Sequence, residues 1–186
     1  MTRTILVFGL IAGCIVSAFM AASMIWVSNH SSSEVGADMS YGMLIGYASQ
    51  LIAFSFIFVA IKTYRDKHQG GSITFWQACK IGLMISLIGS TLYVITWAFI
   101  YNFVMPDFMT HYANAAMESA RASGKSEAEI AALATEMAGY QDMYKSPIGF
   151  TLFTYVEILP TGILVTLISS LILWLTRKKQ SSVANV

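Results

Sequence analysis

Four long runs of apolar residues, separated by polar segments, define the chain. The runs cover residues 4–27, 41–61, 81–104 and 148–176, and together they contain one charged residue, Glu157. A helix needs about 20 apolar residues to cross roughly 30 Å of hydrocarbon, and each run meets that length. The expected fold class is an all-α integral membrane protein, a four-transmembrane-helix bundle in a single domain, 1–186. The predicted spans lie at about 4–28, 41–62, 73–104 and 147–176.

The polar segment between the third and fourth spans, at about 105–146, has the pattern of two helices. Its first half is rich in alanine and ends at Gly124, a residue suited to close a helix. Ser126 and Glu129 then have the spacing of a capping box, which opens a second helix that Pro147 stops. The segment therefore predicts an extracytoplasmic helical hairpin between spans three and four.

Each arm of this predicted hairpin carries an apolar stripe at helical spacing. The stripes most simply pack against each other or against the outer ends of the spans. Binding of a partner protein is the alternative use. The residues that we take as the candidate partner-binding surface are Phe108, Tyr112, Ile130, Leu133 and Met137.

The charged residues are distributed asymmetrically, although the net charge is only +1. Of the 11 Lys and Arg residues, eight lie on segments that alternate as one side of the bilayer. They are Arg3, Lys62, Arg65, Lys67, Lys80, Arg177, Lys178 and Lys179. The opposite segments hold eight acids, namely Glu34, Asp38, Asp107, Glu118, Glu127, Glu129, Glu136 and Asp142. Because basic loops are retained in the cytoplasm, we expect both termini to be cytoplasmic.

Two further features bear on how the spans connect and pack. Residues 62–71 predict a tight, basic inner turn, after which Ser72 or Thr74 caps the third span. Small residues recur at four-residue spacing, and such stripes let transmembrane helices approach closely. We expect them to be packing seams within the chain. They are Gly9, Gly13 and Ser17, then Gly42 and Gly46, then Gly82, Ser86 and Ser90.

Glu157 is the leading candidate for a functional residue. At 1.5 Å per residue it lies about 6 Å from the midpoint of its span, where an ionised acid facing lipid is costly. The same arithmetic places Tyr47 and Tyr93 at nearly the same depth. Pro160 lacks an N–H, so it frees a backbone carbonyl beside the acid and is expected to kink the helix. We therefore predict an intramembrane polar layer of Glu157, Tyr47 and Tyr93, beside Pro160, which either fastens three helices or conducts a proton or solute.

Other chemistry has little support in the sequence. There is no metalloprotease, nucleophile-elbow or phosphate-loop signature, so we expect no enzymatic activity. Cys14 and Cys79 lack metal-ligand spacing, and no metal or cofactor is expected. The cytoplasmic loops are too short for a nucleic-acid-binding module.

Six short stretches carry a resemblance to a known family, namely 46–49, 62–66, 70–75, 105–108, 127–130 and 157–160. Over nearly its whole length the chain resembles a bacterial membrane family known only as domain of unknown function number 4199. The resemblance implies a protein of the bacterial cytoplasmic (inner) membrane with four spans and an outer hairpin. It implies no activity and no ligand.

Two functions remain open at this stage. The first is a non-enzymatic accessory or assembly protein that presents its outer hairpin to a membrane or periplasmic protein partner. The alternative is a small oligomeric proton-coupled transporter that uses Glu157. The lipid bilayer is an expected partner. A second copy of the chain is a candidate partner, since either function could be carried out by a homo-oligomer.

Overall fold

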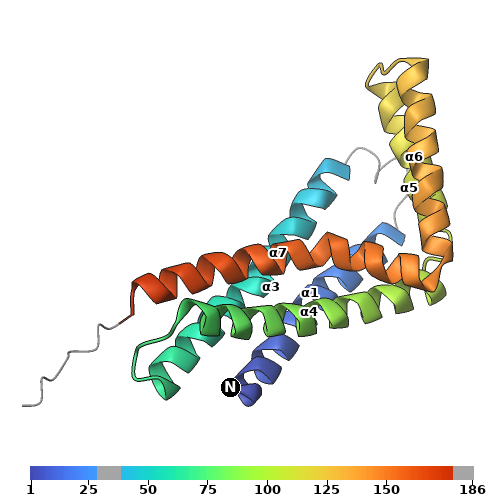
Figure 1. Ribbon diagram of the computed structural model, residues 1–186. Coiled ribbons are helices and arrows are strands. Elements are labelled where there is room, and N and C mark those ends of the chain that lie inside the picture. Colours follow the sequence, from blue (N-terminus) through green and yellow to red (C-terminus); the bar gives the residue numbers. More distant parts are fainter. Residues whose placement is uncertain (29–38, 178–186) are drawn as a thin grey trace, which may run out of the picture. The chain divides into compact units, whose positions relative to one another are not determined.

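The computed structural model describes residues 1–28 and 39–177, without the side-chain surroundings of 27, 28 and 39–43. Within these residues the chain forms six helices and no strand (Figure 1). The helices are α1 (Thr2–Ser28), α3 (Met39–His68), α4 (Phe75–Phe103), α5 (Phe108–Ala122), α6 (Glu127–Lys145) and α7 (Pro147–Leu175). Glu34, Asp38, Lys178 and Lys179, which entered the charge pattern above, lie outside the described residues.

Four of these helices are long and apolar enough to cross a bilayer. The candidate spans are Thr2–Trp26, Leu44–His68, Phe75–Phe103 and Pro147–Leu175. The prediction of four long apolar helices is thus confirmed, and helices of this length and composition indicate a membrane protein.

The end of α3 differs from the sequence-based expectation. Residues 62–68 were assigned to a tight inner turn, but they continue the helix to His68. The basic side chains of the last helical turn favour this because they lie near the negative end of the helix dipole. The helix stops where Gly70 and Gly71 adopt φ angles of 59° and 87°, and Gly71 N–H donates to the Arg65 carbonyl at 3.0 Å. The prediction of a turn over 62–68 was therefore wrong.

Several predicted helix ends are confirmed. The Thr74 hydroxyl accepts a hydrogen bond from Gln77 N–H, at 3.3 Å, and so caps α4. Gly124 has a φ of 73° just after α5, and Ser126 and Glu129 form a capping box at the start of α6. Pro147 is the first residue of α7, so Ser146 alone separates α6 from α7.

By its contacts the chain divides into two units. Unit 1 contains Met1–Val16, Ser49–Leu92 and the described residues from Ile158 onward. Unit 2 contains the described residues of Ser17–Ala48, together with Tyr93–Glu157. The helices α1, α3, α4 and α7 each contribute a segment to both units, whereas α5 and α6 belong to unit 2 alone.

In unit 1, small residues let the helices meet closely around α4. A Cβ added at Gly9 of α1 would lie 2.9 Å from Ile88 of α4. A Cβ added at Gly82 of α4 would lie 2.6 Å from Thr166 of α7 and 3.0 Å from Ile57 of α3. These distances leave no room for a side chain. The stripes of α1 and α4 are therefore packing seams within the chain, as expected.

The small residues of α3 behave differently. Gly46 has no neighbouring atom within 4 Å of an added Cβ, so a side chain at this position would meet open space. The surroundings of Gly42 lie outside the described residues. Elsewhere in unit 1 the α4–α7 seam also holds a polar contact, because the buried hydroxyls of Ser86 and Thr166 lie 3.2 Å apart.

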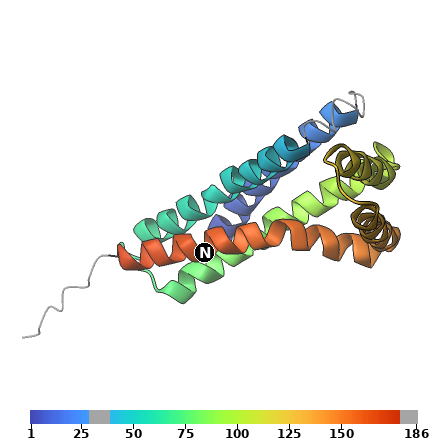
Figure 2. The same cartoon turned by 90° about the horizontal axis from the view of Figure 1, so that it is seen from above.

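In unit 2, α5 and α6 pack side by side, as both views show (Figures 1 and 2). The buried residues of α6, namely Ile130, Met137 and Tyr144, recur every seven positions. Those of α5 are Met109, Ala113 and Ala120. Each helix thus buries one face and leaves its polar face exposed.

Candidate functional site

Three aromatic side chains at four-residue spacing organise unit 2. Tyr93, Trp97 and Tyr101 lie on one face of α4 because residues four apart in a helix are neighbours. Tyr93 and Trp97 are buried, and Tyr101 is half-buried. We call these three residues the aromatic ladder of α4.

Two residues of the aromatic ladder, Trp97 and Tyr101, contact α5, α6 and the start of α7. The Trp97 ring centre lies 4.9 Å from that of Phe108 on α5, in an edge-to-face arrangement. Tyr101 lies 5.3 Å from Tyr144 on α6 and 5.4 Å from Phe150 on α7. Aromatic pairs in this range add stabilisation beyond the area they bury. One face of α4 therefore connects three other helices.

The third residue of the aromatic ladder, Tyr93, forms part of the candidate site. Tyr93 Oη donates a hydrogen bond to Oε1 of Glu157 on α7, at 3.0 Å. The structure thus brings together two of the residues that the sequence placed at one depth. A carboxyl held in this way has a fixed orientation and retains a second oxygen for a proton or another donor.

Glu157 is less enclosed than the sequence suggested. We expected it to belong to a polar layer between helices, but the residue as a whole is exposed, while its hydrogen bond to Tyr93 is partly buried. The cause is the rotational phase of α7. Val156 is 71% exposed and Ile158 is 0% exposed, and each helical residue turns by about 100°. Glu157 therefore lies at the border between the outward and the inward face.

The predicted polar layer also included Tyr47 and Pro160. Tyr47 is 54% exposed, and its hydroxyl forms no hydrogen bond within the described residues. Its α3 neighbours Leu44 and Ile45 are exposed too, so this part of the helix turns the ring outward. Pro160 lies inside α7 and belongs to unit 1. The Glu157–Tyr93 pair is thus the hydrogen-bonded part of the predicted layer, and Tyr47 lies within electrostatic range of Tyr93.

Tyr144 is a residue of the site that the sequence analysis did not assign to it. Burial raises the pKa of the Tyr144 phenol to about 12, although the Trp97 and Thr154 side chains act in the opposite direction through hydrogen bonds. The charge of Glu157 also raises this pKa, so the two groups lie within electrostatic range. The seven-residue spacing from Ile130 through Met137 to Tyr144 was the signal that could have indicated its inward position.

The candidate partner-binding residues are mostly engaged within unit 2. Ile130 and Met137 are buried, and Phe108, Tyr112 and Leu133 are half-buried. Phe108 contacts Trp97 and also stacks with Tyr112, whose ring centre lies 6.0 Å away. These side chains hold the pair together and attach it to α4. A partner would instead meet the exposed polar faces of α5 and α6.

No metal site emerges from the residues that the structure describes. Among them, no three His, Cys, Asp or Glu side chains form a group that could hold a metal ion. Cys14 is exposed and Cys79 is buried, both as free thiols.

The fold and the site define a class: a helical membrane protein with four apolar helices of spanning length and a pair of shorter polar helices inserted before the last. A family model described as a protein of unknown function (DUF4199) matches residues 7–174, and the chain belongs to this family. None of the curated proteins matches the chain, and neither does any solved structure.

Proposed function

We propose that this is a non-enzymatic protein of the bacterial inner membrane that presents the α5–α6 pair, as an extracytoplasmic helical hairpin, to a membrane or periplasmic protein. Both termini are cytoplasmic in this proposal. The distribution of charge supports that orientation. Among the described residues, unit 1 contains six basic residues and one acid, Asp66. Unit 2 contains three basic residues and seven acids. Positive charge is retained on the cytoplasmic side.

The aromatic ladder is the observation that carries the proposal. Trp97 and Tyr101 attach α5 and α6 to α4, while the opposite faces of both helices remain exposed and charged. The segment between Met105 and Pro147 contains six acids and three basic residues, which gives it a net charge of −3. A surface held in one orientation loses less conformational entropy when it binds. We therefore expect a partner with a complementary, basic surface.

Site-specific photo-crosslinking in intact cells tests this proposal. A photoreactive residue at Thr135, which is exposed on α6, should give a discrete adduct with a second protein. The matched control is Leu167, which is exposed on the apolar surface of α7 and should give none. If Glu118, Thr135 and Asp142, all exposed, yield no adduct, the partner proposal is wrong.

The hydrogen-bonded pair of Glu157 and Tyr93 favours a second candidate, a proton-coupled transporter. An exposed carboxyl in a span, oriented by a phenol, is a group that could take up and release a proton. Glu157→Gln keeps an acceptor for Tyr93 but cannot ionise. In proteoliposomes containing a pH-sensitive dye, a transporter would lose its proton flux with this substitution. An accessory protein would keep the Thr135 adduct and show no flux in either form.

A further inference from the structure

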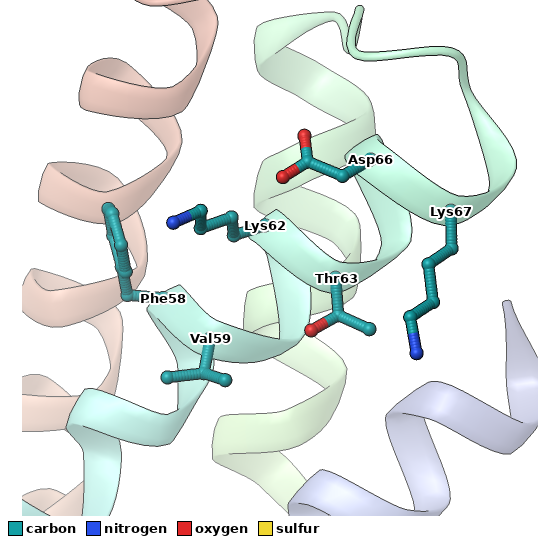
Figure 3. Close-up of a pocket in the computed structure, with 6 residues that line it drawn as sticks. All are labelled: Phe58, Val59, Lys62, Thr63, Asp66 and Lys67. Atoms are coloured by element: carbon teal, nitrogen blue, oxygen red, sulfur yellow. The ribbon is translucent and has the colours of Figure 1, made fainter.

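The last turns of α3 carry a surface hollow that the proposed function does not use. It has a volume of about 380 Å³ and is lined by Phe58, Val59, Lys62, Thr63, Asp66 and Lys67 (Figure 3). The lining residues come as neighbouring pairs that recur every four positions, so they form one continuous strip along the helix. We call this strip the α3 hollow. It lies entirely within unit 1.

Cationic side chains outnumber acids at the polar end of the α3 hollow. Asp66 Oδ1 accepts a hydrogen bond from Arg65 Nε at 2.8 Å, so this acid is already partnered. A terminal nitrogen of Arg65 donates to the Leu173 carbonyl near the end of α7, at 3.3 Å, which fixes the guanidinium in place. Lys62 and Lys67 add two further positive charges. Two cations and one carboxylate that is already paired therefore line the polar end of the α3 hollow, and the region attracts anions.

The order of chemistry along the α3 hollow matches an amphiphile. Phe58 and Val59 form the apolar end, and Lys67 lies about 12 Å further along the helix axis at 1.5 Å per residue. Figure 3 shows Thr63 between the two lysines, whose ammonium groups point in different directions, so both lysines turn towards an anion that accepts from the Thr63 hydroxyl. A free phosphate ion has no apolar group that could pack against Phe58 and Val59. A phospholipid would place its phosphate by the lysines and its acyl chains by the apolar side chains.

The neighbouring side chains locate this strip at a membrane–water interface. At the same ends of the helices, Arg177 lies over the Trp174 ring, 4.9 Å from its centre, and Trp174 packs against Phe75. Tryptophan and basic residues together are typical of the interfacial region, where head groups lie. Basic hollows between or beside transmembrane helices on the cytoplasmic side bind anionic head groups.

We propose that the α3 hollow binds an anionic phospholipid, with its phosphate held by Lys62, Lys67 and Thr63 and its acyl chains along Phe58 and Val59. Phosphatidylglycerol and cardiolipin have the required chemistry. This inference needs the membrane location but not the partner protein. A failure of the crosslinking experiment above therefore leaves it unaffected.

Lipid binding to the purified full chain tests the proposal. In neutral detergent, phosphatidylglycerol should raise the melting temperature and remain bound in native mass spectrometry, whereas phosphatidylcholine should do neither. The double variant Lys62→Gln/Lys67→Gln should weaken binding of phosphatidylglycerol at least tenfold. The matched control is Lys80→Gln, which removes an exposed cation of unit 1 outside the hollow and should bind as the wild type does. Equal retention of the two lipids, or unchanged binding by the double variant, overturns the proposal.

Two measurements on the wild-type chain keep the test decisive if the double variant does not fold. A photoreactive phosphatidylglycerol should crosslink to a peptide that contains residues 58–67, and a crosslink confined to other segments overturns the proposal. Inorganic phosphate at equal concentration should not displace the lipid. Full displacement would show that the hollow is a site for free phosphate and would also overturn it.

Discussion

The hydrogen bond between Tyr93 and Glu157 gives a polar neighbour to an acid that the surrounding span does not otherwise accommodate. In the proposed membrane location, the carboxyl would lie in hydrocarbon, which solvates it poorly, and the phenol would lower that cost. Because Tyr93 is itself buried on α4, the bond also links α4 to α7. At the scale of single residues, substitutions of this pair and of Tyr144 are therefore expected to change both the ionisable groups of the site and the stability of the fold.

The bond makes a measurable contribution to stability. Tyr93→Phe removes the donor without changing the ring, and we expect the free energy of unfolding to fall by about 0.5–2 kcal/mol. Glu157→Leu removes the acceptor. In a double-mutant cycle followed by denaturant unfolding in detergent micelles, the two changes should not be additive. Additive effects would show that the hydroxyl and the carboxyl do not interact.

The phenol of Tyr144 predicts a dependence of stability on alkaline pH. Since burial raises its pKa from 10.0 to about 12, the folded protein keeps this group neutral to a higher pH than the unfolded chain does. Its contribution is complete below pH 10 and is lost as the pH rises towards 12. The loss is at most about 2–3 kcal/mol. Unfolding free energies measured between pH 8 and 12 should show this decline in the wild type, and the decline should be smaller in Tyr144→Phe.

At the scale of helices, α4 is the element on which the others depend. Its unit 1 segment receives α1, α3 and α7 at small residues, and its unit 2 segment carries the aromatic ladder. The close approaches at Gly82 leave no space for a methyl group, whereas Gly46 on α3 is open. The same substitution at the two positions should therefore have opposite effects.

Gly82→Ala would place a Cβ 2.6 Å from Thr166, so α7 or α3 must shift. We expect a loss of about 1–3 kcal/mol in the free energy of unfolding, as for other overpacked sites. Gly46→Ala is the matched control and should be neutral or stabilising by up to about 1 kcal/mol, since alanine favours the helix. Denaturant titration of both variants checks this. Equal destabilisation of the two would mean that the α4 seam is not close-packed.

At the scale of the whole molecule, the proposed orientation can be measured directly. In a background with Cys14 and Cys79 replaced by alanine, Ser123→Cys places a thiol in the exposed connection between α5 and α6. A membrane-impermeant maleimide should label it in intact cells. Gln69→Cys, in the connection between α3 and α4, should be labelled only after the membrane is permeabilised. The reverse pattern would invert the proposed topology.

The sequence predicted features that depend on composition and local spacing. The four apolar helices, the capping box at Ser126 and the glycine cap at Gly124 follow from such signals, and the structure contains them. Depth arithmetic placed Tyr93 level with Glu157, and the structure joins them by a hydrogen bond. Depth alone, however, does not give the direction in which a side chain points.

Features that depend on rotation or on distant contacts were missed. Tyr47 lies within electrostatic range of Tyr93, but the rotation of its helix leaves its ring 54% exposed. Tyr144 lies 51 residues along the chain from Tyr93 and reaches the site only because α6 folds back on α4. The extension of α3 to His68 was also missed, because the basic residues that indicate a loop equally suit the last turn of a helix.

The single residue between α6 and α7 has a mechanical consequence. With only Ser146 as a linker, there is no slack to absorb a displacement of α6. Any force that a bound molecule exerts on α6 is delivered to the first turn of α7, about 15 Å along that helix from Glu157. In the proposed orientation, a partner that displaces α6 would therefore also displace the helix that carries Glu157.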